Sequence, residues 1–234
     1  MDTKIDFKNP EFYENRELSW IKFDNRVLSE ARDKSIPLLE RLKFVSITSS
    51  NLDEFFMVRV ASLQDMVHAN YKKRDIAGMT ATEQLAAINK ATRELVDTQY
   101  NTYTRSLVPL LNKEGIYLVD EHETLTDEQA QFVDRYFMES VYPVLTPMAV
   151  DASRPFPLIR NKTLNIAALL SRKQNSKETV FATVQVPSVL PRLVPIPSAE
   201  ETHTFILLEQ IIERNIGLLF SNYKVLCAYP YRIM

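Results

Sequence analysis

Apolar residues in the first part of the chain recur with the period of an amphipathic helix. Trp20, Phe23, Val27 and Ala31 follow one another at steps of three and four residues. Such steps place side chains on one face of a helix, so residues 20–31 are predicted to be helical. Ser19 precedes this stripe and is expected to cap the helix, since a serine hydroxyl can accept a hydrogen bond from a free backbone amide.

Two more apolar stripes follow, and a short polar run separates them. Pro37 suits the first turn of a second helix, whose stripe is formed by Leu38, Leu42 and Val45. The run Ser49-Ser50-Asn51 interrupts this stripe, and a third stripe begins at once with Leu52, Phe55, Phe56, Val60, Leu63 and Val67. The pattern predicts two helices with a break at Asn51.

A fourth helix is predicted after a polar connection that contains Lys72-Lys73-Arg74 and Gly78. Thr80 and Glu83 have the spacing of a capping box, and apolar positions continue from Leu85 toward Leu110. Helices joined by short polar links pack as a small bundle. Residues 1–112 are therefore predicted to form a helical N-terminal domain.

The second half has the pattern of a mixed domain, predicted to span residues 113–234. A helix is expected to start at Thr126, and four prolines between Pro143 and Pro157 disfavour helix in that stretch. Strands are predicted at 116–119, 164–170, 180–186 and 223–229, an extended segment at 187–197 and a last helix at 205–220. The fold class is α+β: an N-terminal helical bundle followed by a mixed α/β head domain, which we expect to be incomplete at its C-terminal end.

Composition narrows the functional classes. The 234 residues carry a net charge of −2, which argues against a protein that coats nucleic acid. No apolar run is long enough to span a bilayer, and the first residues lack the apolar core of a signal peptide. A single cysteine, Cys227, suits a reducing cytoplasm. The three glycines lie far apart, so neither a P-loop nor a dinucleotide-binding fingerprint is present.

Asn51 has two interpretations. It can cap the helix that follows, because asparagine is among the best capping residues and Glu54 stands three positions later. Alternatively, its amide can read a polar base edge such as that of adenine, since it offers both a donor and an acceptor. The pattern of residues leaves both interpretations open.

Other polar groups favour structural roles. Asp53 and Glu54 are explained by the positive end of a helix, and adjacent residues diverge too far to act on one substrate atom. His68, His122 and His203 lack metal-ligand spacing, so no metal site is predicted. The aromatic residues are interpreted as core rather than as a stacking platform. Arg154, Arg160 and Lys162 form a modest basic cluster that suits either a surface loop or a passing polyanion.

Several separated blocks resemble the bacterial polyphosphate kinase family. In the first half they are Glu17-Leu18-Ser19-Trp20 with Phe23, residues 37–44, and Ser50-Asn51-Leu52-Asp53-Glu54-Phe55-Phe56-Met57-Val58-Arg59. In the second half they are Arg154-Pro155-Phe156-Pro157, Leu164-Asn165 and the proline-containing run at 186–192. The blocks keep their order across nearly the whole chain.

This resemblance implies a reaction and its partners. The family reversibly transfers the terminal phosphate of ATP to inorganic polyphosphate through a phosphohistidine, with Mg²⁺ neutralising the phosphates. It implies ATP or ADP as nucleotide, a cytoplasmic enzyme with a peripheral membrane location left open, and a homodimer or higher homo-oligomer. The asparagine that matches Asn51 contacts the ATP base in this family, and this favours the second interpretation of Asn51.

The resemblance also implies what the chain lacks. The family's phosphorylated histidine, metal ligands and phosphate-binding arginines belong to later domains, so the sequence is expected to be an N-terminal portion that is inactive alone. It would supply a base contact and domain or dimer contacts. A non-enzymatic helical interaction module is the alternative. A complete small phosphotransferase is disfavoured, because no nucleophile or phosphate-binding arrangement is present.

Overall fold

The computed structural model describes residues 6–150, 156–173 and 175–234, and the chain divides into two compact units. Met1–Glu114 is called the helical unit below and Gly115–Met234 the sheet unit. Arg154 and Pro155, which belong to the expected basic cluster and to one resemblance block, lie outside the described residues. Helices are followed by mixed sheets, which confirms the predicted α+β class.

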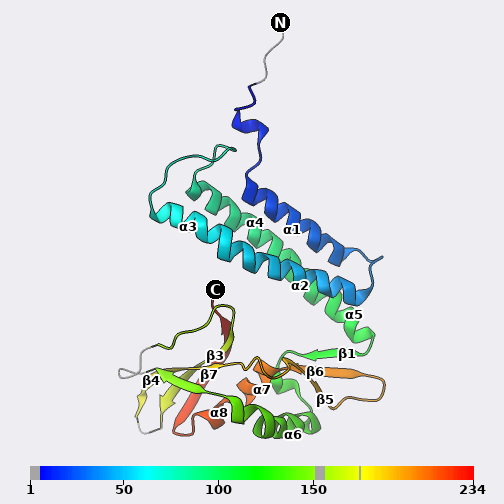
Figure 1. Cartoon of the computed structure of the whole chain (residues 1–234). Helices are drawn as coiled ribbons and strands as arrows, with labels where there is room; N and C mark the ends of the chain where they lie inside the picture. Colours follow the sequence, from blue (N-terminus) through cyan, green and yellow to red (C-terminus); the bar gives the residue numbers. More distant parts are fainter. Residues whose placement is uncertain (1–5, 151–155, 174) are drawn as a thin grey trace. The chain divides into compact units, whose positions relative to one another are not determined.

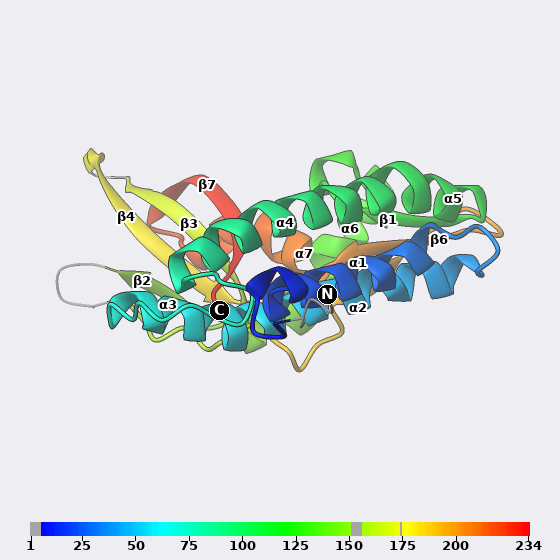
Figure 2. The same ribbon diagram turned by 90° about the horizontal axis from the view of Figure 1, so that it is seen from above.

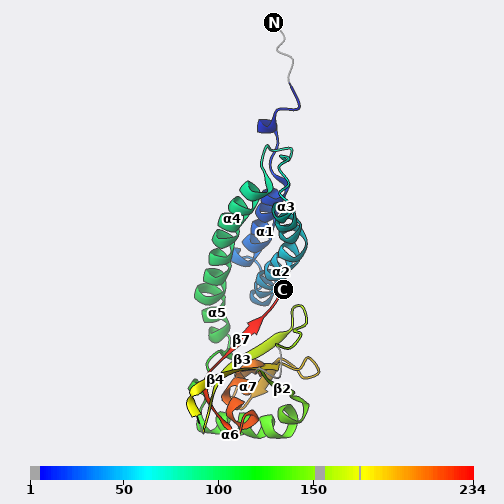
Figure 3. The same cartoon turned by 90° about the vertical axis from the view of Figure 1, so that its left-hand side faces the viewer.

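Three long helical rods lie side by side in the helical unit (Figures 1 and 2). The first is α1 (Arg16–Arg32), which follows a single 3₁₀ turn at Pro10–Phe12. The second joins α2 (Leu38–Phe55) to α3 (Ala61–His68) through a π-helical segment, Phe56–Val60. The third joins α4 (Ala81–Thr102) to α5 (Val108–Lys113) through another π-helical segment, Tyr103–Leu107, so that α4 and α5 form one rod (Figure 3).

The first rod begins earlier than its sequence pattern predicted. Asn15, not Ser19, caps α1, and its side-chain oxygen accepts hydrogen bonds from the backbone amides of Glu17 and Leu18. The buried face of α1 is also rotated from the expected stripe, because Ile21, Leu28 and Ala31 are buried while Phe23 is 47% exposed.

The second rod corrects the expected break at Asn51. Helix continues from Leu38 through Phe55, so Asn51 lies in a helix interior and caps nothing. The third stripe also does not keep one period. The π-helical segment adds a residue to one turn and re-phases the helix, so Phe55 and Val60 are both buried although they stand five residues apart.

The third rod confirms the capping box. The Thr80 hydroxyl accepts from the backbone amide of Glu83, and the Glu83 carboxylate accepts from the backbone amide of Thr80. The core between the rods is apolar and is formed by Ile21, Leu28, Ala31, Leu52, Phe55, Val60, Leu63, Ala81, Ile88 and Leu95.

The sheet unit contains two sheets. A three-stranded sheet has the order β1-β6-β5, in which β1 (Ile116–Val119) is parallel to β6 (His203–Leu207) and β5 (Leu193–Ile196) is antiparallel to β6. A four-stranded antiparallel sheet has the order β2-β4-β3-β7. Its strands are β2 (Pro147–Val150), β3 (Leu164–Arg172), β4 (Asn175–Gln185) and β7 (Tyr223–Arg232), and the longest three lie side by side in Figure 2.

Helices cover these sheets with apolar side chains. A 3₁₀ turn at His122–Thr124 precedes α6 (Asp127–Tyr136), which starts at the predicted cap Thr126 and runs into a π-helical segment, Phe137–Val141, and a 3₁₀ turn, Tyr142–Val144. Two short helices, α7 (Leu208–Arg214) and α8 (Ile216–Leu219), follow β6. Val133, Phe137, Ile166, Ile206 and Ile211 are among the residues of one buried core.

The helix expected at 205–220 is wrong at its start. Phe205, Ile206 and Leu207 belong to β6, which pairs with β1 on one side and β5 on the other. A short apolar run suits a buried strand as well as a helix, and pairing partners far along the chain decide between them. No helix within the described ranges is long and apolar enough to cross a membrane.

Candidate functional site

Asn51 lies at the wall of a pocket in the helical unit. The pocket has a volume of about 310 Å³ and is lined by Trp20, Phe23, Asn51, Glu54, Phe55, Val58 and Arg59. Its walls are one face of α1 and the end of α2 with the π-helical segment. This volume is at the lower end of the range for small-molecule sites.

Two larger grooves on the same unit have a different character. One, of about 500 Å³, runs between the π-helical segment, α3 and α4, and the other, of about 550 Å³, runs between α1 and α4. Both have mainly apolar floors formed by helix faces. Asn51 lines neither of them. In the smaller pocket, the Asn51 amide lies together with aromatic side chains, a combination of polar and apolar groups that small-molecule sites use.

The Asn51 amide is held from the facing helix. Its nitrogen Nδ2 donates to Oδ1 of Asp24 at 2.8 Å. Within the described part of the chain, the Asn51 oxygen Oδ1 takes part in no protein hydrogen bond. Asn51 is half-buried and lines the pocket, so its amide is not sealed among packed side chains. The arrangement leaves a carbonyl acceptor for a ligand.

Asp24 is an unusual residue for an apolar helix interface. Its side chain is fully buried, and its second oxygen, Oδ2, has no hydrogen-bond partner among the described residues. Burial raises the pKa of Asp24 above its usual value, and the hydrogen bond from Asn51 opposes that shift. The carboxylate therefore depends on Asn51 for compensation inside the bundle.

Three aromatic residues, Trp20, Phe23 and Phe55, line the pocket. Trp20 and Phe55 stack with their centroids 4.4 Å apart and their planes within 7° of each other. Phe55 also meets Phe56 edge-on at 5.9 Å. Phe23 remains 47% exposed, with the Arg26 guanidinium 5.9 Å from its ring centre. The expected core role holds for Phe55, which is buried, and is wrong for Phe23, which is exposed. A flat apolar ligand can pack against such rings.

The π-helical segment brings charge to the same pocket. Val58 and Arg59 lie within Phe56–Val60, where the extra residue in the turn shifts both outward while Val60 stays buried. Arg59 and Glu54 therefore line the pocket beside Asn51. Asp53 does not line it, which fits the expected divergence of adjacent residues on a helix.

The remaining candidates lie elsewhere. His68 is exposed at the end of α3, whereas His122 and His203 belong to the sheet unit, where Glu123 is 3.5 Å from Nδ1 of His122. Across the described ranges, His, Cys, Asp and Glu form no group of three or more suited to a metal ion. Arg160 and Lys162 are exposed, and Lys162 has a positive φ of 62°.

Sequence reasoning missed Asp24. One signal was present, because Asp24 stands three residues after Ile21 and four before Leu28, on the face that the structure buries. A carboxylate on an apolar face needs a partner. The expected stripe through Trp20 and Phe23 placed that face wrongly, so the conflict was not visible.

Known proteins are similar to this chain in sequence and in fold. The family model for the polyphosphate kinase N-terminal domain matches residues 13–119, and the one for the polyphosphate kinase middle domain matches residues 128–234. Polyphosphate kinases of Lactiplantibacillus plantarum and Synechocystis are 51% and 43% identical over 98% of the chain. The crystal structure of polyphosphate kinase from Porphyromonas gingivalis superimposes with a TM-score of 0.81 and 30% identity over 93% of the chain.

The match is to one part of longer proteins. The chain spans 32% of the length of the Lactiplantibacillus plantarum and Synechocystis relatives and 32% of the Porphyromonas gingivalis chain. Within that part, two adjoining family models account for both units in their expected order. The two family models, which together match most of the chain, and the similarity in sequence and fold to known members show that this chain belongs to the polyphosphate kinase family.

Proposed function

We propose that the chain is the nucleotide-base-binding portion of a polyphosphate kinase, which reversibly transfers the terminal phosphate of ATP to polyphosphate. The observation that carries this proposal is the Asn51 pocket. A half-buried amide with a free carbonyl acceptor lies among aromatic rings, in a chain of this family. Exposed helix surfaces of ordinary proteins do not need such a combination.

The pocket suits an adenine base better than a phosphate group. Adenine presents an exocyclic amine, which is a donor that the Asn51 oxygen can accept, and a flat ring that can pack on Phe23 and Trp20. Among the residues that the structure describes, Arg59 is the one cation that lines the pocket, and Glu54 lines it as well. One cation beside one carboxylate does not form the cluster of cations that stabilises a transferring phosphoryl group.

Phosphoryl transfer therefore needs groups beyond the matched portion. A phosphohistidine and the Mg²⁺ that neutralises ATP belong, in this proposal, to the rest of the enzyme. Because ATP is the substrate, the proposed location is the cytoplasm. The proposed assembly is a homodimer or a higher homo-oligomer, and sedimentation of the whole enzyme distinguishes the two.

A chimeric enzyme tests the proposed function. The matched 230 residues of the Lactiplantibacillus plantarum polyphosphate kinase are replaced by this chain, which is 51% identical to them, and ATP-dependent polyphosphate synthesis is measured. We expect activity. Asn51→Ala in the chimera should raise the KM for ATP about five- to tenfold with kcat nearly unchanged, since a single hydrogen bond to the base is lost.

Ser50→Ala is the matched control. Ser50 precedes Asn51 on α2, is exposed and does not line the pocket, so its removal should leave the KM unchanged. An Asn51→Ala chimera with the KM of the parent chimera would refute the base contact. An inactive parent chimera whose CD spectrum and denaturation curve match those of the intact relative would refute the enzyme assignment.

A further inference from the structure

We propose that Asp24 is a positioning residue that orients the Asn51 amide and thereby selects a 6-amino purine over a 6-oxo purine. This inference rests on the proposed function, because it concerns how the Asn51 pocket reads a base. It adds a residue that the base does not touch. Asp24 is fully buried on α1 and does not line the pocket, whereas Asn51, its hydrogen-bond partner on α2, does.

Asp24 and Asn51 differ in the hydrogen bonds that their side chains can make. A carboxylate accepts hydrogen bonds and donates none, whereas an amide side chain has one donating and one accepting end. Asp24 therefore draws the Asn51 nitrogen toward itself, and the observed bond from Nδ2 to Oδ1 measures 2.8 Å. The opposite end of the amide, the oxygen, is left for the pocket. An asparagine without this partner can rotate by half a turn and present either end.

Burial of the Asp24 carboxylate lowers the stability of the helical unit. Both oxygens are buried, and Oδ2 has no hydrogen-bond partner among the residues that the structure describes. An apolar residue at this place would pack against Ile21 and Leu28 without that cost. A buried polar group that weakens a core is expected where function requires it.

The orientation of the Asn51 amide determines which purine base it can bind. Adenine carries a donating amine where guanine carries an accepting oxygen. An Asn51 oxygen held in the pocket accepts from adenine and repels guanine, while a freely rotating amide accommodates both. Asp24 thus acts on the choice of base through Asn51, and its removal should reduce the discrimination more than it reduces the affinity.

Trp20 provides a direct readout on the 234-residue chain. It is the single tryptophan of the sequence, and it lines the pocket with Asn51. Its fluorescence is titrated with ATP and with GTP in the wild-type chain and in Asp24→Asn. Asparagine has nearly the same shape as aspartate but can donate as well as accept, so either orientation of Asn51 becomes possible. We expect the wild-type chain to prefer ATP and the variant to lose about tenfold of that preference.

Gln99→Leu is the control for a general loss of stability. Gln99 is 7% exposed on α4 and donates to the Val45 carbonyl on α2, so it is also a buried polar contact between two rods. Its removal should lower the stability of the helical unit and leave the preference for ATP unchanged. An equal loss of preference in Gln99→Leu and Asp24→Asn would overturn the positioning role.

The remaining outcomes separate the inference from the function on which it rests. A wild-type chain that responds to neither nucleotide refutes the base contact, and this inference with it. Equal responses to ATP and GTP leave the base contact standing and refute the orientation alone. The same holds for a folded Asp24→Asn chain that keeps the wild-type preference.

An NMR measurement covers the case in which Asp24→Asn does not fold. In the wild-type chain, the side-chain amide protons of Asn51 should exchange with solvent more slowly than those of Asn25, which is exposed on α1. Equal exchange of the two amides would mean that Asp24 does not hold Asn51, and would overturn the inference without any substitution.

Discussion

Asp24 and Asn51 show how a contact between facing helices changes the meaning of a residue. By sequence, Asn51→Asp is the ideal probe of a base contact, since aspartate caps a helix as well as asparagine does. In the structure Asn51 caps nothing, and its nitrogen faces a carboxylate. The first effect of Asn51→Asp is therefore repulsion between two carboxylates inside the helical unit, and any effect on base binding is added to it.

We predict that Asn51→Asp destabilises the helical unit by roughly 2 kcal/mol or more. It removes the donor to Asp24 and places a second carboxylate beside a buried one, where the two repel each other. Urea denaturation followed by circular dichroism measures the loss. Ser50→Asp introduces the same charge at the exposed neighbouring position and should cost little. Equal midpoints for the two variants would contradict the prediction.

The buried carboxylate also predicts a dependence of stability on pH. Burial raises the pKa of Asp24 above its ordinary value of 3.8, and the Asn51 hydrogen bond partly offsets this. The folded chain thus holds the Asp24 proton more tightly than the unfolded chain. As the pH rises through the interval above 3.8, the contribution of Asp24 to the free energy of unfolding must fall.

Asp24→Asn isolates this effect from that of other carboxylates. Three other carboxylates have lowered pKa values, so the stability that they contribute is lost as the pH falls. The main cause is a hydrogen bond to the carboxylate: from the Ser35 backbone amide for Asp33, from the Thr80 backbone amide for Glu83, and from the Arg214 side chain for Asp134. These groups are common to both chains. The wild-type minus variant difference in unfolding free energy should decrease with rising pH, and a difference that increases with pH would show that the sign is wrong.

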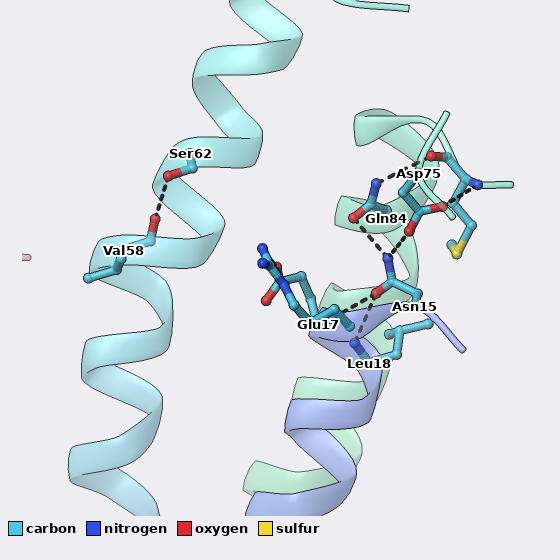
Figure 4. A network of polar contacts seen from close by, with 9 residues as sticks. Asn15, Glu17, Leu18, Val58, Ser62, Asp75 and Gln84 are labelled. Carbon is cyan, nitrogen blue, oxygen red and sulfur yellow. Dashed lines mark hydrogen bonds and ion pairs between the residues drawn. The ribbon is translucent and has the colours of Figure 1, made fainter. Parts of the chain in front are cut away.

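At the scale of elements, the start of α1 is fixed by a network rather than by a single cap. The Asn15 oxygen caps the helix, while its nitrogen donates to Asp75 at 2.6 Å and to Gln84 at 2.9 Å (Figure 4). Asp75 in turn accepts from the backbone amide of Met79 at 2.7 Å. One side chain therefore joins the start of α1 to the loop before α4 and to α4 itself.

Asn15→Ala should cost more than the loss of an ordinary cap. A cap is worth about 0.5–2 kcal/mol, and the variant also leaves the buried Gln84 oxygen without its donor, so we expect roughly 2–3 kcal/mol. Asn15→Ser should restore the capping hydrogen bond but not the hydrogen bond to Gln84, so it should recover only the part of the stability that the cap supplies. Thr80→Ala, which removes the cap of α4, is the comparison within the same unit. Urea midpoints check the order, and a smaller loss for Asn15→Ala than for Thr80→Ala would refute it.

At the scale of the whole molecule, each unit has its own apolar core and its own family match. All residues that line the Asn51 pocket belong to the helical unit, so the base contact that we propose would be made by this unit alone. Within the described residues, neither unit brings together a cluster of metal ligands. We propose that base recognition and phosphoryl transfer belong to different parts of the enzyme.

We therefore predict that the purified 234-residue chain makes no polyphosphate from ATP. Transfer of a phosphoryl group requires cations around the phosphates and a positioned nucleophile, and the Asn51 pocket supplies neither. Incorporation of radiolabelled phosphate into acid-insoluble polymer measures this, with the active chimera as the positive control. Sustained synthesis by the chain alone would contradict the division of roles.

Much of the architecture was predictable because it depends on local chemistry. Thr80 with Glu83 and Thr126 with Gln129 start helices where expected, since a capping box involves residues only three positions apart. The alternating runs that became β3, β4 and β7 were recognised from their own pattern. The resemblance blocks identified the family, which the comparisons confirm.

Contacts between distant segments decided the rest. The order of strands assigned Phe205–Leu207 to β6, and the π-helical segment re-phased the rod that contains Arg59. Capped helices, alternating strands and the family blocks could be read from the chain alone, because those signals lie within a few turns of chain. The pairing of Asn51 with Asp24 could not, since a hydrogen bond across 27 positions depends on how two helices pack.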